Sequence, residues 1–150
     1  MIMSDFQMQD YCIKKLTYEY IPNLTENAQV PLEYYAHATH ECLDGVFNGN
    51  VFLGFRAVLK EQPSKDQAHD ITLYEVVIQG SFSMPAADQP DAEKRFVKMM
   101  KINGAASLIP IARAALVSAS SVMHIPKAFP LPNINVYELV WKDSLPASPT

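Results

Sequence analysis

The chain has 150 residues, of which 49% are hydrophobic and 19% are charged, and its formal net charge at pH 7 is −4. This composition excludes an intrinsically disordered chain, and the negative balance argues against a nucleic-acid-binding protein, which needs a clustered basic face. Cys12 and Cys42 stand in no repeated spacing, and neither a signal peptide nor an uninterrupted apolar run of about 18 residues is visible, so we expect a cytoplasmic protein.

The first half of the chain predicts four strands, because β-branched and aromatic residues alternate with polar ones between short polar loops. The predicted strands are Tyr11–Tyr20, Leu32–Leu43, Val51–Lys60 and Ile71–Met84. Four such strands favour an antiparallel sheet with one buried face. In the last strand the expected buried residues are Tyr74, Val76, Ile78, Gly80, Phe82 and Met84, while Glu75, Gln79, Ser81 and Ser83 are expected on the polar face.

The second half of the chain predicts helices. Asp91–Met100 has acidic residues at its start and lysines at its end, and Asn103-Gly104 is expected to break it. A second helix is predicted from Ala105 to Met123, with Pro110 in its early turns, and Ile134–Trp141 is expected to form a last short helix or strand. We therefore predict an α+β fold, a four-stranded antiparallel sheet followed by two to three helices packed on one face. The expected domain spans residues 1–143, with a mobile tail at 144–150.

Small residues line one side of the second predicted helix at Ala112, Ala115 and Ala119. Such residues let a helix lie close to a sheet or to another helix. Both packing within the chain and a seam between subunits explain the pattern. We take these three alanines as a candidate oligomer interface.

Catalytic and cofactor motifs are missing from the sequence. There is no GxSxG elbow, no phosphate-binding GxxxxGK[ST], no GxGxxG and no HExxH. His40, Cys42 and Asp44 would share one face of a strand, but no second cluster supplies further zinc ligands, so a solvated polar face is the better interpretation. We expect a protein without enzymatic activity, cofactor or metal.

Three segments carry a resemblance to the SecB family of protein-export chaperones. Gly80–Met84 resembles the end of the family's last strand, Gly-x-Phe-Ser plus an apolar residue. Leu108–Arg113 is similar to the family's Leu-[Phe/Tyr]-Pro-Tyr-Ala-Arg helix opening, with Ile111 in place of the Tyr. Leu131–Val136 resembles Leu-Pro-Pro-[Ile/Val]-Asn-Phe, with Asn133 in place of the second Pro. The likeness extends from about Tyr11 to Trp141.

The resemblance implies a homotetramer built as a dimer of dimers. It also implies a chaperone that holds unfolded or precursor polypeptides in apolar grooves, keeps them competent for translocation and passes them to the SecA motor. An unfolded segment would place alternate apolar side chains in the groove, with backbone contacts near a strand edge. The candidate residues for one wall are Leu32, Tyr34 and Tyr35, and those for the other wall are Phe129, Leu131, Val136 and Trp141. Ordinary packing at the edge of the core is the alternative for each of them.

Docking to SecA is where the sequence departs most from the family. Of the acidic positions that the family offers on the outer sheet face, Glu75 matches one, whereas Tyr20 and Leu24 occupy the other two. We therefore expect any SecA binding to be weak and nearly insensitive to salt. Two other hypotheses stay open: a SecB-like chaperone dedicated to one partner, such as an antitoxin, and a small-molecule-binding protein on the same fold.

Overall fold

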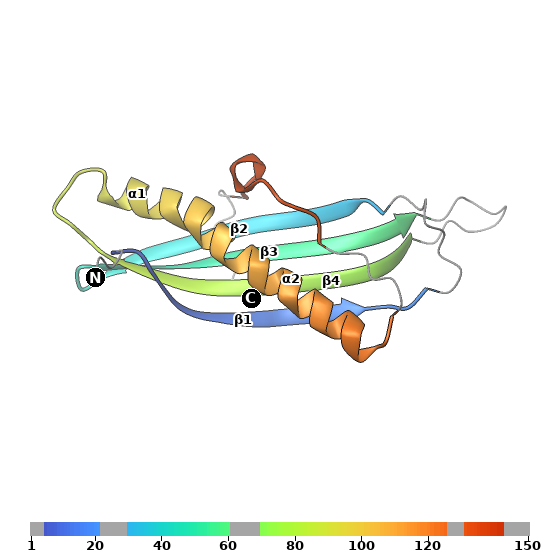
Figure 1. The fold of residues 1–150 in the computed structure, drawn as a ribbon. Helices are drawn as coiled ribbons and strands as arrows, with labels where there is room; N and C mark the ends of the chain where they lie inside the picture. Colours follow the sequence, from blue (N-terminus) through green and yellow to red (C-terminus); the bar gives the residue numbers. More distant parts are fainter. Residues whose placement is uncertain (1–4, 22–29, 61–69, 126–130, 143–150) are drawn as a thin grey trace.

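The computed structural model describes residues 5–21, 30–60, 70–125 and 131–142. Four strands form one antiparallel sheet in the order β1-β4-β3-β2, and a long helix lies diagonally across one face of it (Figure 1). The strands are β1 (Gln7–Tyr18), β2 (Leu32–Leu43), β3 (Val46–Lys60) and β4 (Asp70–Pro85). The predicted α+β class and four-stranded antiparallel sheet are confirmed.

Strand pairing places the alternating residues as the sequence predicts. Leu53 pairs with Ile78, and Phe55 with Val76, and these four side chains are buried on the face that the helix covers. On the opposite face the polar partners hydrogen-bond, since Ser81 Oγ donates to Asn50 Oδ1 at 2.8 Å. One face of the sheet is therefore apolar core and the other is largely polar.

A two-residue turn at Asp44-Gly45 joins β2 to β3. The φ angles are +51° at Asp44 and +74° at Gly45, and Leu43 pairs with Val46 directly behind them. Positive φ at both central residues is the geometry of a type I′ turn, whose twist matches that of the flanking strands. This turn sets the register of β2 and β3.

The helical half of the chain is one long helix and not the two to three helices that the sequence predicts. α1 (Ala92–Met99) runs through a π-helical turn, η1 (Met100–Gly104), into α2 (Ala105–Val122) without a break. Gly104 keeps helical angles of −63° and −50°, and a Cβ there would lie 3.3 Å from Phe82 and Val51. The glycine thus permits close contact with the sheet and does not end the helix. Pro110 consequently lies inside the helix and not in its early turns.

Small residues also let α2 approach the sheet where it crosses β4. A Cβ at Gly80 would lie 2.7 Å from Leu108 Cδ2. Ala112 is 0% exposed, and Ala119 is half-buried and packs against the same core. Since Ala112 is covered by its own chain, it is not available to a second subunit, and of the predicted interface only the half-buried Ala115 and Ala119 retain some exposed surface.

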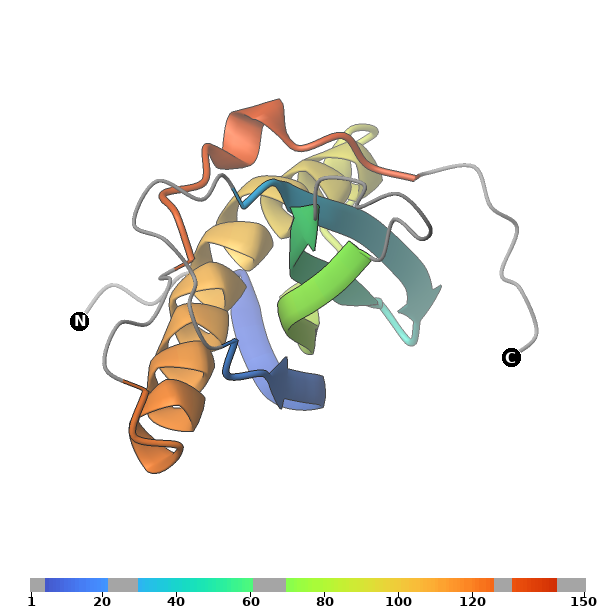
Figure 2. The same cartoon turned by 90° about the vertical axis from the view of Figure 1, so that its right-hand side faces the viewer.

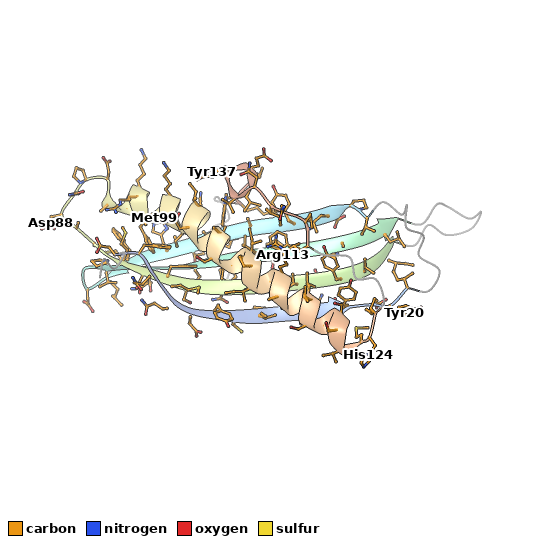
Figure 3. All side chains as sticks on the ribbon, viewed as in Figure 1. Tyr20, Asp88, Met99, Arg113, His124 and Tyr137 are labelled. Atoms are coloured by element: carbon orange, nitrogen blue, oxygen red, sulfur yellow. The ribbon has the colours of Figure 1, made fainter. Side chains whose placement is uncertain are left out.

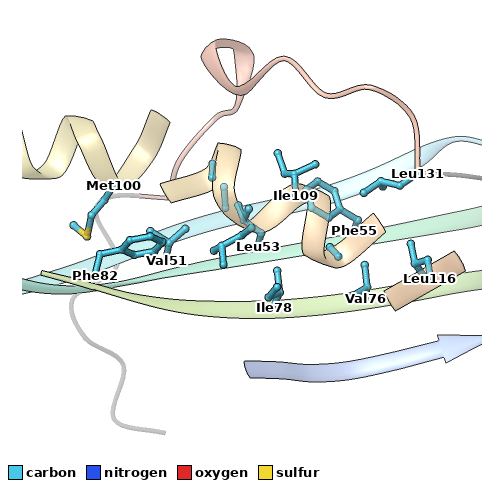
Figure 4. Close-up of a cluster of buried hydrophobic side chains, with 14 of the residues drawn as sticks. Val51, Leu53, Phe55, Val76, Ile78, Phe82, Met100, Ile109, Leu116 and Leu131 are labelled. Carbon is cyan, nitrogen blue, oxygen red and sulfur yellow. The ribbon is translucent and has the colours of Figure 1, made fainter. Parts of the chain in front are cut away.

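The core lies between the helix and the covered face of the sheet (Figure 4). Aromatic contacts anchor its α1 end: the Phe96 ring stacks on Phe47 with centroids 5.4 Å apart, and Phe6 stacks on Phe82 at 5.2 Å. Leu108 and Leu116 continue the buried stripe along α2. The largest fully buried side chains are Tyr74, Phe55, Phe82, Phe96, Leu53, Ile78, Met100, Leu108, Leu116, Val51 and Val76.

The chain returns over β2 after the long helix, on the same side of the sheet (Figure 2). Within the predicted element Ile134–Trp141 only a single 3-10 turn forms, η2 (Val136–Glu138). Asn135 caps it, since its side chain accepts the backbone N–H of Tyr137 at 3.1 Å. The predicted tail at 144–150 lies outside the described residues.

By length and composition alone, the helix from Ala92 to Val122 is apolar enough to cross a membrane, in contrast to the expectation from the sequence. Core helices of soluble proteins meet the same criterion. Here Phe96, Leu108 and Leu116 are buried within the chain. Packing on the sheet accounts for these buried residues, and 33% of the apolar window is buried inside the chain.

Removing the hydroxyl of Tyr74 is expected to reduce the loss of folding stability at alkaline pH. Burial, and to a lesser degree Tyr18, raises the pKa of Tyr74 to about 12, whereas a phenol in an unfolded chain titrates near 10. Below pH ~10 the group is neutral in both states. Between pH ~10 and ~12 only the unfolded state loses the proton, so stability falls as pH rises. Tyr74→Phe should remove about 2 kcal/mol of that fall.

Urea unfolding of both proteins on either side of this pH window measures the effect. Tyr11→Phe is the matched control, because Tyr11 is 49% exposed. An alkaline loss of stability that is the same in Tyr74→Phe as in the unsubstituted protein would contradict the assignment.

Candidate peptide-binding groove

A groove with a volume of about 700 Å³ runs between the start of the long helix and the returning C-terminal segment. Its floor is apolar and its helix-side rim is charged. The floor residues are Val97, Ile102, Val136, Leu139 and Trp141, and the helix-side rim residues are Pro90, Asp91, Glu93, Lys94, Lys98 and Lys101. Tyr137 of η2 borders the groove on the C-terminal side. The size falls in the range of ligand sites in proteins.

The helix wall follows from how α1 packs on the sheet. Phe96 and Met100 are four residues apart and fully buried, so they point at the sheet together. Val97, one position after Phe96, is rotated by about 100° and reaches the groove floor. His40 on β2 ties α1 to the sheet, with Nε2 2.8 Å from Glu93 Oε1.

Core packing and hydrogen bonds hold the C-terminal wall in place. Leu131 is 3% exposed in the core, and Arg113 on α2 donates to the carbonyl oxygens of Leu131 and Pro132 at 3.3 and 3.1 Å. Further along, the N–H of Val140 donates to the hydroxyl of Tyr34 at 3.1 Å. The N–H of Lys142 donates to the carbonyl of Ala36 at 3.0 Å, and His37 Nδ1 lies 2.9 Å from the carbonyl oxygen of Lys142, so Lys142 lies against the outer edge of β2.

The rim and floor meet at Lys101 and Trp141. Lys101 Nζ lies 5.9 Å from the centroid of the Trp141 ring. A cation over an indole face gains about 0.5–1 kcal/mol at an exposed site. The contact joins the two walls of the groove at one end. Tyr137 is 76% exposed on η2 (Figure 3), so an aromatic ring stands free beside this floor.

Of the residues predicted to line a groove, the structure places two in it, Val136 and Trp141. Leu131 is core, and Leu32 is half-buried against the core. Tyr34 is on the helix side of β2 and supports the C-terminal wall through its hydroxyl. Phe129 lies outside the described residues.

Tyr35 is on the opposite face of the sheet from the groove. Its ring lies across Gly54 of β3, where an added Cβ would come within 2.1 Å of the ring. Burial, then the nearby Glu75 carboxylate, raises the pKa of its phenol, while Lys15 lowers it. Neighbouring residues on a strand face opposite ways, so Tyr34 and Tyr35 cannot form one wall as predicted.

The residues predicted to meet SecA are only partly brought together. Glu75 is on the open face of β4, where its carboxylate lies 2.5 Å from Lys15 Nζ. Tyr20 follows β1 and is 59% exposed. Leu24 lies outside the described residues. The one acidic group at these positions already has an intramolecular cation beside it.

The sequence did not predict the helix wall of the groove. This wall consists of Val97, Ile102 and a row of three lysines, Lys94, Lys98 and Lys101 (the lysine row). The signal was present: beside its buried residues Ala92 and Phe96, α1 carries apolar residues at Val97 and Met99, which make a wider apolar stripe than one sheet contact needs.

Potential metal ligands stay apart in the part of the chain that the structure describes. No group of three or more His, Cys, Asp or Glu side chains gathers within the described ranges, and His37 and His40 face opposite sides of β2.

No protein-family model and no curated protein matches the sequence. Among solved structures, the fold is similar to that of a SecB-like chaperone of Mycobacterium tuberculosis in complex with a ChAD peptide from the HigA1 antitoxin. The TM-score is 0.55 at 12% sequence identity, and the match covers 87% of this chain and 91% of that chain. The chain therefore has a SecB-like fold, as its three motifs predict.

Proposed function

We propose that this protein is a non-catalytic chaperone that binds unfolded segments of other polypeptides. The observation that carries the proposal is the open groove between α1 and the C-terminal segment, with its floor of Val97, Val136 and Trp141. An open apolar floor suits an extended chain, because it accepts side chains of varied shape without a fixed register. The solved structure with the similar fold contains a peptide ligand, which supports a polypeptide as the ligand class.

The working form in this proposal is a cytoplasmic homotetramer that holds clients without nucleotide or metal. The outward side of α2 supports assembly, because it carries no charged residue. Its exposed members are Ala106, Ser107, Pro110, Ala114, Val117, Ser118, Ser121 and Val122. Symmetric association is a common use of such a surface.

Two narrower client classes fit the groove. The first is precursor proteins that are kept competent for export and delivered to SecA. The second is one dedicated partner such as an antitoxin, the ligand type that the similar Mycobacterium tuberculosis chaperone holds. The pairing of Glu75 with Lys15 leaves little charge for docking a basic motor surface, and this favours the dedicated partner.

Suppression of aggregation of a reduced, unfolded model protein is the test of the proposal. We expect suppression near stoichiometric amounts of chaperone, and a negative heat-capacity change when a client peptide is titrated by calorimetry, because apolar surface is buried. Light scattering on the same sample gives the assembly mass. Neither suppression nor peptide binding at micromolar concentrations would refute the function. A titration of SecA at low and high salt separates the client classes: tight, strongly salt-dependent binding would support export.

A further inference from the structure

The charge on the groove rim differs in sign from the charge of the whole chain. The lining holds three lysines, Lys94, Lys98 and Lys101, against two carboxylates, Asp91 and Glu93, which gives 3 − 2 = +1. The net charge of the chain is −4. Glu93 is also placed 2.8 Å from His40 Nε2. A cationic rim therefore borders an apolar floor on an otherwise acidic protein.

Two lysines of this rim, Lys94 and Lys98, are available to a ligand. Lys94 and Lys98 are exposed, and neither makes an ion pair within the described ranges. Lysines beside apolar surface usually lay their methylene groups along it and keep the ammonium group in solvent. An anionic ligand that approached the floor would meet them without displacing an existing partner.

The spacing of these lysines matches an extended polypeptide. Lys94 and Lys98 are four residues apart within α1, which places them about 6 Å apart along the helix axis. Side chains on one side of an extended strand repeat about every 6.6 Å. Two carboxylates at alternate positions of a bound strand would therefore face these two ammonium groups, while the intervening side chains point at the floor.

We infer that the groove prefers polypeptide segments in which acidic side chains alternate with apolar ones. The inference rests on the proposed polypeptide-binding function and specifies its ligand class. The apolar residues supply most of the affinity by covering Val97, Val136 and Trp141, and the acidic residues select among apolar segments. Segments with basic residues at the alternate positions are disfavoured, because their charges face the lysine row.

Fluorescence anisotropy with three labelled synthetic peptides tests the preference. All three share the same alternating leucines, and the positions between them hold Glu in the first peptide, Gln in the second and Lys in the third. Two exposed ion pairs should make the Glu peptide bind about fivefold more tightly than the Gln peptide at low salt. The Lys peptide should bind more weakly than the Gln peptide, and salt at about 0.5 M should remove most of the difference.

The variant Lys94→Gln/Lys98→Gln should bind the Glu and Gln peptides equally. Its matched control is Lys14→Gln/Arg95→Gln, which removes two exposed cations outside the groove lining and should retain the fivefold preference. Equal binding of the Glu and Gln peptides to the unsubstituted protein would overturn the inference while leaving the proposed function intact. A preference that survives in Lys94→Gln/Lys98→Gln would overturn it as well. Binding of no peptide at all would remove both the inference and the function.

Discussion

Phe96→Ala is expected to lower the free energy of unfolding by about 3–5 kcal/mol, the usual cost of truncating a buried phenylalanine. Phe96 is 0% exposed, and its ring contacts Phe47 at a centroid distance of 5.4 Å and Phe6 at 6.0 Å. Its removal takes apolar area out of the core and leaves a cavity beside the Phe47 and Phe6 rings. A single domain has about 5–15 kcal/mol of stability, so this one change removes a large share of it.

Chemical denaturation followed by tryptophan fluorescence and circular dichroism measures the loss. Val117→Ala is the matched control on the same helix, because Val117 is 53% exposed and its truncation should cost less than about 0.5 kcal/mol. An equal effect of the two substitutions would mean that α1 does not pack on the sheet as the structure has it. The groove would then lack its helix wall.

The strands could be predicted from sequence because period-two alternation reports directly on which face is buried. Leu32–Leu43 is predicted with its observed ends, and Glu75, Gln79, Ser81 and Ser83 share one face of β4 as predicted. The helix was harder, because Asn103-Gly104 has the composition of a helix stop. At Gly104 the missing side chain instead makes room for Phe82 and Val51, and no local pattern distinguishes these two uses of glycine.

The site could be predicted only in part for a related reason. Val136 and Trp141, two of the residues predicted for one wall, line the candidate groove. Leu131 is also an apolar residue beside prolines, but Arg113 of α2 donates a hydrogen bond to its carbonyl oxygen and holds it in the core. The local sequence does not reveal this long-range contact. The lysines of α1 fit a solvated helix face equally well, and only the return of the C-terminal segment alongside makes them a rim.

Trp141→Ser is expected to weaken client binding, and Tyr35→Ser is expected to leave it nearly unchanged, although the sequence predicted both as groove residues. Trp141 lies on the groove floor beneath Lys101, so its removal takes away the largest apolar contact and the cation–π partner. Truncating an aromatic anchor of this kind typically costs about 2 kcal/mol, or roughly thirtyfold in affinity. Tyr35 lies over Gly54 on the opposite face of the sheet, so Tyr35→Ser should leave affinity within about twofold.

Anisotropy of a labelled apolar peptide, measured on both variants beside the unsubstituted protein, decides between the two faces. Trp141→Phe is the conservative companion, because it keeps an aromatic ring on the floor and should recover most of the affinity. Circular dichroism and the unfolding midpoint establish that each variant is folded, since Trp141 is half-buried and packs against the core. If Tyr35→Ser weakened binding and Trp141→Ser did not, the client would bind the open sheet face around Glu33, Arg56 and Glu75. The groove between α1 and the C-terminal segment would then have to be abandoned as the site.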